Sequence, residues 1–270
     1  MTDNTKSGYR LCAVDMDGTL LTSDNRITDA TIDAIRAVSG RGIYFCLTTG
    51  RPPVAVMPYQ RALGLDTPII VYNGGRIVDP DGSETLFERT LDRQNALDVM
   101  LTGMEIGATM CLWAKDRLYA NTVNERSEFY RQVSGAEMTV PGDILPLAGK
   151  NIMKIVMCGT PDEISRYQSA ARERLGDTVS IASSGPEFLE FFDRRVSKGA
   201  ALEKLCGILG IDVSETIAIG DSYNDEQLLR AAGLGIAMGN APDEIKDICA
   251  EVTASNDEDG VRLVLEKYFL

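Results

Sequence analysis

The 270-residue chain is 44% hydrophobic and 25% charged, which is enough apolar sequence to bury one large core or two smaller ones. Its net charge of −13 and its lack of a basic tract argue against nucleic acid or an anionic membrane as a partner. No stretch approaches the roughly 18 apolar residues that span a bilayer, and the polar first residues lack the apolar core of a secretion signal. A cytoplasmic protein is therefore expected.

The chain contains no histidine, which restricts the chemistry available to it. Ser/His/Asp triads, histidine-based phosphatases, Cys/His proteases and His-ligated zinc are excluded. The six cysteines are scattered without a CxxC pair, which is typical of reduced structural thiols. Any catalysis must then rest on carboxylates, Lys, Ser/Thr, Tyr or Cys.

The first part of the chain alternates predicted strands and helices. Short apolar runs read as buried strands, and capped segments with apolar residues three and four apart read as helices. Glycines and prolines mark the turns between them. The elements expected here are a strand at 10–14, a helix from Thr28, a strand at 43–48, a helix at 54–63 and a strand at 69–72.

The pattern changes between about Gly82 and Asp193. NGG at Asn73 and DPDG at Asp79 are hairpin-type turn signals. They are followed by an expected strand at 84–91, capped helices starting at Asp92 and Thr160, and strands at 152–157 and 188–192. This stretch is predicted to be an inserted α+β domain.

The alternation resumes near the C-terminal end, with a helix at 198–209, a strand at 216–220, a helix at 225–232 and an apolar stretch at 235–238. Alternating strands and helices favour a parallel sheet covered on both faces. The expected fold class is α/β, a Rossmann-like doubly wound parallel sheet formed by residues 1–82 and 194–270, with the inserted domain at 83–193.

Four polar motifs follow predicted strands or begin a helix, and the carboxyl ends of strands are where ligands bind in doubly wound sheets. In DMDGTL, Asp15 and Asp17 are two residues apart on an extended segment, so both face one side and one can attack while the other handles a proton. The hydroxyl of Thr49 and the amide of Gly50 can hold a phosphoryl oxygen. Taken alone, each of these two motifs is also compatible with an ordinary turn.

The other two motifs lie in the last third of the chain. Lys198 follows Ser197 at a predicted helix start, where an ammonium and free amides can face an anion, although a lone lysine is usually a solvated surface charge. The loop GDSYND places Asp221 and Asp225 after a strand, and alone it is equally compatible with a capped helix start. Oxygen ligands of this kind suit magnesium.

Together the four motifs resemble the ordered set of the haloacid dehalogenase-like (HAD) phosphatases: DxDGT, then Thr, then Lys, then GDxxND. The closer resemblance is to the Cof-type, class IIB sugar-phosphate phosphatases, through DMDGTLL, LTTGRP, YNGG, FLEFFDRRVSKG, AIGDSYNDEQLL, GIAMGNA and the ending SNDEDGVRLVLEKYFL. The resemblance covers essentially the whole chain. It implies a HAD core with a cap at 83–193 that sets substrate selectivity, a Mg²⁺ cofactor and small phosphorylated metabolites as substrates, sugar phosphates among them.

The resemblance also implies a role for each motif residue. Asp15 would be nucleophile and magnesium ligand, Asp17 would be general acid/base and bind the metal through its carbonyl, and Asp221 would complete the protein ligands. The remaining candidates would bind phosphate (the Met16 amide, Thr49, Gly50, Lys198 and Asn224) or lie around the metal and pocket (Asp225, Ser222, Arg51 and Asn73).

Two other functions share parts of this pattern. A phosphohexomutase carries the same motifs with a similar cap, and release of free phosphate separates a phosphatase from it. A phospho-acceptor signalling domain also uses acids, a Thr and a Lys, but it is about half this length and has no inserted domain. The sequence specifies neither the substrate, nor the oligomeric state, nor the pathway.

Overall fold

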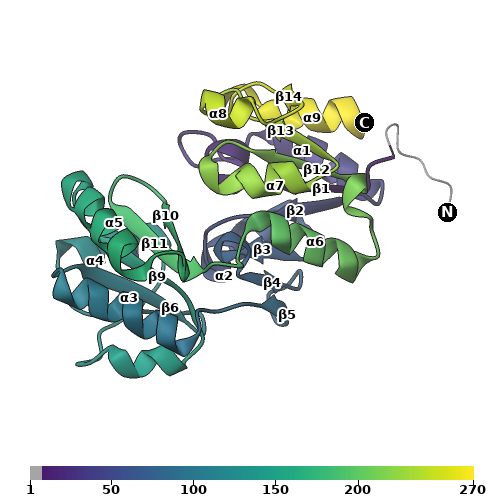
Figure 1. Cartoon of the computed structure of the whole chain (residues 1–270). Helices are drawn as coiled ribbons and strands as arrows, with labels where there is room; N and C mark the ends of the chain where they lie inside the picture. The colour runs from purple at the N-terminus through teal and green to yellow at the C-terminus, as the bar shows by residue number, and fades with distance from the viewer. Residues whose placement is uncertain (1–7) are drawn as a thin grey trace. The chain divides into compact units, whose positions relative to one another are not determined.

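The structure is a computed structural model that describes residues 8–270 (Figure 1). It divides into two compact units. Unit 1 contains the described residues of Met1–Gly50 together with Val56–Phe87 and Ser197–Leu270, and unit 2 contains Arg51–Ala55 and Glu88–Val196. The larger unit is thus assembled from both ends of the chain.

Unit 1 is built on a five-stranded parallel sheet with the strand order β14-β13-β12-β1-β2. The neighbours of β1 are β2 on one side and β12 on the other, so the two ends of the chain meet at the centre of this sheet. The strands are β1 (Leu11–Val14), β2 (Tyr44–Leu47), β12 (Thr216–Gly220), β13 (Leu234–Ala237) and β14 (Glu251–Val252).

Helices cover both faces of this sheet, which explains why β1 and β12 are buried along their whole length. Leu11 and Ala13 of β1 belong to a core cluster with Leu202 and Leu205 of α6, whereas α1 and α9 pack against each other on the opposite side (Figure 1). The helices that accompany the sheet are α1 (Asp29–Gly40), α2 (Pro53–Leu63), α6 (Lys198–Leu209), α7 (Glu226–Ala231), α8 (Asp243–Lys246) and α9 (Gly260–Tyr268).

A small antiparallel sheet continues from the parallel one. Its order is β3-β4-β5, with β3 (Ile69–Val71), β4 (Arg76–Val78) and β5 (Thr85–Glu88), and Thr48 forms a parallel bridge to Ile70 of β3. The two turn signals in the sequence mark its two connections. The strand expected at 84–91 ends at Glu88 in the structure. Leu91 lies in unit 2, where it pairs with Ile152 in an isolated bridge.

Unit 2 is a six-stranded sheet with the order β10-β11-β9-β6-β7-β8. Helices α3 and α5 bury one face against Leu112, Ile155 and Phe191, while α4 lies on the other face, where Tyr130 contacts Trp113. The strands are β6 (Thr109–Ala114), β7 (Arg117–Ala120), β8 (Met138–Thr139), β9 (Ile152–Cys158), β10 (Val179–Ser183) and β11 (Phe188–Asp193), and the helices are α3 (Arg93–Glu105), α4 (Glu125–Ser134) and α5 (Pro161–Leu175).

The α/β fold class with a parallel core sheet is confirmed. None of the helices within residues 8–270 combines the length and apolar character needed to cross a membrane.

Candidate active site

The first motif begins where β1 ends. Asp15 is buried, with 4% of its surface exposed, and its backbone amide continues the sheet by donating to the carbonyl of Ile219. The chain then turns through Gly18, whose φ of +74° is in the left-handed region. A Cβ at Gly18 would lie 2.5 Å from Oδ2 of Asp221, so a larger residue would be strained and would displace that carboxylate.

The second motif leaves β2 and meets the turn after β3. The Asn73 amide donates to the Thr49 carbonyl at 3.0 Å, and Thr49 is completely buried. Gly50 faces the Asn73 side chain so closely that a Cβ there would lie 2.8 Å from Oδ1 of Asn73. Asn73 itself adopts φ +57°, a conformation that Asn tolerates better than most residues. The two segments therefore hold one another in place.

The third motif is the start of α6. The Ser197 hydroxyl caps the helix by accepting from the Ala200 amide, and Gly74 allows the Ser197 carbonyl to approach, since a Cβ at Gly74 would be 2.2 Å from it. Lys198 follows as the first helical residue and is fully buried. Its Nζ donates to Oδ1 of Asp15 at 2.5 Å and to Oδ1 of Asp225 at 2.6 Å.

The fourth motif is the loop after β12. Oδ2 of Asp225 accepts from the amides of Asp221 and Ser222, both at 3.1 Å, which makes the loop a tight turn. Asp221 accepts from the Thr19 hydroxyl at 2.8 Å, and Asn224 donates to Asn73 at 3.2 Å. This loop therefore contacts both the first motif and the turn after β3.

Negative charge dominates the centre of the site. Carboxylate oxygens of Asp15, Asp221 and Asp225 lie within 4.8 Å of one another, and Lys198 is the cation bonded to two of these groups. Burial, together with the charge of Asp225, raises the pKa of Asp15 well above its usual value. Burial likewise raises the pKa of Asp221 to about 6.

The pKa of Lys198 is also raised, but for a different reason. Burial alone would lower the pKa of Lys198, but the charges of Asp15 and Asp225 outweigh that effect and raise it above the usual lysine value. The lysine is therefore fully charged at neutral pH, and one ammonium faces three carboxylates. The excess of hard oxygen donors fits a divalent cation such as Mg²⁺.

Most of the residues predicted from the sequence lie in this one place. The structure joins Lys198 to Asp15 and Asp225, and Asn73 to Asn224, and it brings Asp221 within the same cluster. Four other predicted residues lie as follows. Met16 is buried next to Asp15, and Asp17 is exposed. The Ser222 hydroxyl donates to Asn224, and Arg51 belongs to unit 2.

Two polar residues of the site were not predicted. Thr19 donates to Asp221, and Asn240 donates to the Gly18 carbonyl at 2.8 Å. Thr19 is part of the DxDGT motif, and its side chain could have been singled out there. Asn240 lies in the GIAMGNA stretch, but that stretch does not indicate its contact, because its partner is 222 residues away.

Known proteins of similar sequence identify the family of this chain. The sequence profile of the haloacid dehalogenase-like hydrolases matches residues 12–265. Phosphatase YwpJ of Bacillus subtilis is 31% identical, covering 93% of this chain and 97% of its own. A second B. subtilis relative, the 5-amino-6-(5-phospho-D-ribitylamino)uracil phosphatase YcsE, is also 31% identical, covering 97% and 96%.

Solved structures give the same assignment. A haloacid dehalogenase-like hydrolase from Bacteroides thetaiotaomicron superimposes with a TM-score of 0.87 at 26% identity, covering 96% of this chain and 99% of the other. The resemblance inferred from the motifs is confirmed. The chain is a phosphatase that belongs to the haloacid dehalogenase-like hydrolase family.

Proposed function

We propose that the chain is a magnesium-dependent phosphatase that hydrolyses small phosphorylated metabolites, sugar phosphates among them, through a phosphoryl group carried on Asp15. The observation that carries this proposal is the buried Lys198, bonded to both Asp15 and Asp225 beside Asp221. A buried carboxylate fixed by an ammonium at the carboxyl end of a parallel strand is well placed to attack a phosphate monoester.

The first half-reaction forms the bond between Asp15 and phosphorus. A carboxylate oxygen of Asp15 attacks phosphorus while the bond from phosphorus to the leaving-group oxygen breaks. Asp17 donates a proton to that oxygen, so the product leaves as an alcohol. Lys198 holds Oδ1 of Asp15 and therefore fixes the direction of the carboxylate before attack.

The second half-reaction regenerates the enzyme. Asp17, now deprotonated, accepts a proton from water, and the water oxygen attacks phosphorus. The bond between phosphorus and Asp15 breaks, which releases inorganic phosphate and restores the carboxylate. Thr49, Gly50, Asn224 and the Met16 amide are the groups that would hold the phosphoryl oxygens during both steps.

The metal would be held by Asp15, Asp221 and the carbonyl of Asp17. When bound, Mg²⁺ would offset the repulsion between the anionic substrate and Asp15. Asp225 differs from these ligands, because Lys198 occupies its Oδ1 and two backbone amides occupy its Oδ2. With both oxygens already bonded, Asp225 serves better as a positioning group for Lys198 and the metal-binding loop than as a direct ligand.

The substrate class is supported by the named relatives. YcsE and YitU of B. subtilis are named for a phosphorylated ribityl chain attached to a pyrimidine, at 31% and 28% identity. We infer that this chain also acts on a phosphate ester of a small polyhydroxylated molecule. Unit 2 would be the cap that selects among such molecules.

A panel of phosphorylated sugars and small cofactors, assayed for free phosphate, tests the proposal. Release should stop with a chelator and return with Mg²⁺ better than with Ca²⁺, because calcium adopts a larger and looser coordination shell. Full turnover in the chelator would contradict the assignment of Asp221. Transfer of phosphate between sugar positions without free phosphate would indicate a mutase instead.

A further inference from the structure

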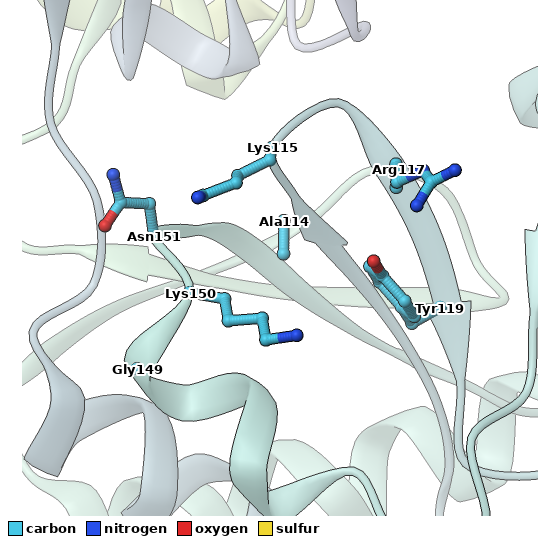
Figure 2. Close-up of a pocket in the computed structure, with 7 residues that line it drawn as sticks. All are labelled: Ala114, Lys115, Arg117, Tyr119, Gly149, Lys150 and Asn151. Atoms are coloured by element: carbon cyan, nitrogen blue, oxygen red, sulfur yellow. The ribbon is translucent and has the colours of Figure 1, made fainter.

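Unit 2 contains a pocket of about 330 Å³ that lies entirely within its own residues (Figure 2). Its wall carries three positively charged side chains. Lys115 and Arg117 come from the end of the β6–β7 hairpin, and Lys150 comes from the segment before β9. In Figure 2, Ala114 lies between Lys115 and Lys150, and Tyr119 and Asn151 complete the polar wall.

The backbone around this pocket is unusual. Lys115 and Asp116 form the two-residue turn between β6 and β7, with φ of +49° and +57°. Turns of this type favour Asn and Gly, because most side chains are strained at positive φ. Asn151 across the pocket also has a positive φ, of +53°, and the pairing of β6 with β9 shifts register between Trp113 and Ala114. Irregularities of this kind commonly accompany functional sites.

The three cations have no ion-pair partner among the described residues. Within residues 8–270, the side chains of Lys115, Arg117 and Lys150 make no hydrogen bond or ion pair. Two acids are close to this wall: Asp116 shares the turn with Lys115, and Glu88 accepts from Asn151 at 3.2 Å. In a chain with a net charge of −13, three unpaired cations around one hollow are a local reversal of sign.

We propose that this pocket binds an anionic group, a phosphate or a carboxylate, of a small metabolite. Two lysines and one arginine supply charged donors from two sides, and Asn151 and Tyr119 add neutral hydrogen-bonding groups. The volume suits a small molecule or part of one. Three cations are too few to hold a nucleic acid or a membrane surface against the net charge.

This inference stands on the pocket alone and does not require the chain to be a phosphatase. If the proposed function holds, two sources of the anion share the same chemistry. One is a second anionic group on the substrate, distant from the phosphate that is removed. The other is a free anion, such as inorganic phosphate, that binds independently of turnover.

The binding test uses inorganic phosphate on the full-length protein, followed by the amide NMR signals of residues 114–119 and 149–151 at constant ionic strength. These signals should shift and saturate with phosphate and not with chloride, separately from any signals around Asp15. Arg117→Gln should weaken this binding about tenfold or more, since a charge-assisted hydrogen bond is lost. Lys115→Asn should weaken it similarly while retaining a residue that suits the turn.

The matched control is Arg172→Gln, which removes one exposed positive charge from α5 in the same unit. It should leave phosphate affinity within about twofold, because a single distant surface charge is screened by salt. Pocket signals that do not respond to phosphate, or equal weakening by Arg172→Gln and Arg117→Gln, would overturn the proposal.

Kinetics then identify the source of the anion. If the substrate supplies it, Arg117→Gln should lower kcat/KM for a sugar bisphosphate about tenfold more than for the matching monophosphate. If a free anion supplies it, the ratio of the two kcat/KM values should equal that of the wild type, while the loss of phosphate binding persists. A chain that turns over neither substrate contradicts this sugar phosphate as a substrate and leaves the NMR result as the deciding test of the pocket.

Discussion

At the scale of single residues, Lys198 is the group on which the proposed site depends. It is fully buried between Asp15 and Asp225, and its ammonium forms an ion pair with each of these carboxylates. Burying a charge is costly unless it is paired, so the two carboxylates and the lysine stabilise one another. The proposed catalytic role and local stability are therefore coupled at this residue.

Lys198→Met tests that coupling. Losing the ammonium should lower kcat about 10²-fold or more and destabilise the fold by about 3 kcal/mol, because two carboxylates remain buried without their cation. Urea unfolding and steady-state kinetics measure the two effects. Lys204→Met on the exposed side of the same helix should change neither appreciably. A folded Lys198→Met enzyme with a near-normal kcat would show that the lysine is only structural.

Gly18 gives a second test at this scale, with an internal reference. Both Gly18 and Gly42 have positive φ, +74° and +82°, but only at Gly18 would a Cβ meet Asp221. Gly42→Ala should cost about 1 kcal/mol of stability and leave kcat unchanged. Gly18→Ala should also reduce kcat about 10²-fold, because it displaces a carboxylate of the site.

Thermal unfolding and kinetics on both glycine variants separate backbone strain from the contact with Asp221. Equal behaviour of the two variants would show that the close approach of Gly18 to Asp221 is unimportant for turnover.

The residues that the sequence could predict are those with fixed spacing along the chain. The four motifs indicate Asp15, Lys198, Asp221 and Asp225 because each follows a strand or begins a helix, and the fold brings those ends together. The contacts of Thr19 with Asp221 and of Asn240 with Gly18 depend on side-chain geometry over more than 200 residues. No local pattern encodes that geometry.

At the scale of helices and strands, capping residues in the sequence correctly predict where four helices begin. Thr28, Asp92, Thr160 and Ser197 each cap the helix predicted to follow them, and Thr160 forms a capping box with Glu163. The buried strands of the core were likewise recognised from short apolar runs.

Most of the elements that the sequence did not predict are in unit 2 or at the C-terminal end, and strand β4 of unit 1 is an exception. Helix α4 is strongly polar on average, and its cap pairs Asn124 with Ser127 in place of the usual acidic partner. Strand β7 is four residues long and follows a turn, Lys115–Asp116, that lacks the glycine expected at positive φ. Tertiary packing determines these elements more than local propensity does.

One contact links two strands of unit 2 through buried charges. Lys154 of β9 donates to Glu190 of β11 at 2.7 Å, and both side chains are about 95% buried, while the Ser184 hydroxyl donates to the same carboxylate. A buried pair of this kind contributes little over an apolar pair, but breaking it is costly.

Glu190→Leu should therefore destabilise the protein by about 3 to 5 kcal/mol, and adding Lys154→Met should recover most of that loss. Urea unfolding of the two single variants and the double variant forms the cycle. As a reference, Arg230→Ala breaks an exposed pair with Glu226 and should cost only a few tenths of a kcal/mol. A double variant as unstable as Glu190→Leu would refute this view of the pair.

At the scale of the whole molecule, the chain separates the proposed chemistry from the proposed selection of substrate. Asp15, Thr49, Lys198 and Asp221 belong to unit 1, and unit 2 has its own sheet, helices and hydrophobic core. The order of elements along the sequence predicts an insertion, because the alternation of strands and helices stops and later resumes. Which residues of the insertion contact a substrate depends on tertiary structure that the sequence pattern does not specify.

Replacing Glu88–Val196 with a short Gly/Ser linker tests this division. If circular dichroism shows a folded core, the shortened enzyme should still cleave acetyl phosphate with Mg²⁺ while its preference among larger phosphorylated metabolites disappears. A folded core that retains its preference would remove the selective role from unit 2. Loss of acetyl phosphate cleavage would instead place a catalytic group there.

The central claim is that the phosphoryl group passes through Asp15, and trapping that intermediate tests it most directly. Asp17→Asn should form the phosphorylated enzyme with p-nitrophenyl phosphate, whose leaving group needs little protonation, and should hydrolyse it slowly for lack of a base. Intact mass after an acid quench should show one added phosphoryl group, which peptide mapping places on Asp15. The double variant Asp15→Asn/Asp17→Asn should show none. A phosphoryl group found on a serine or threonine, or present equally in the double variant, would contradict the mechanism.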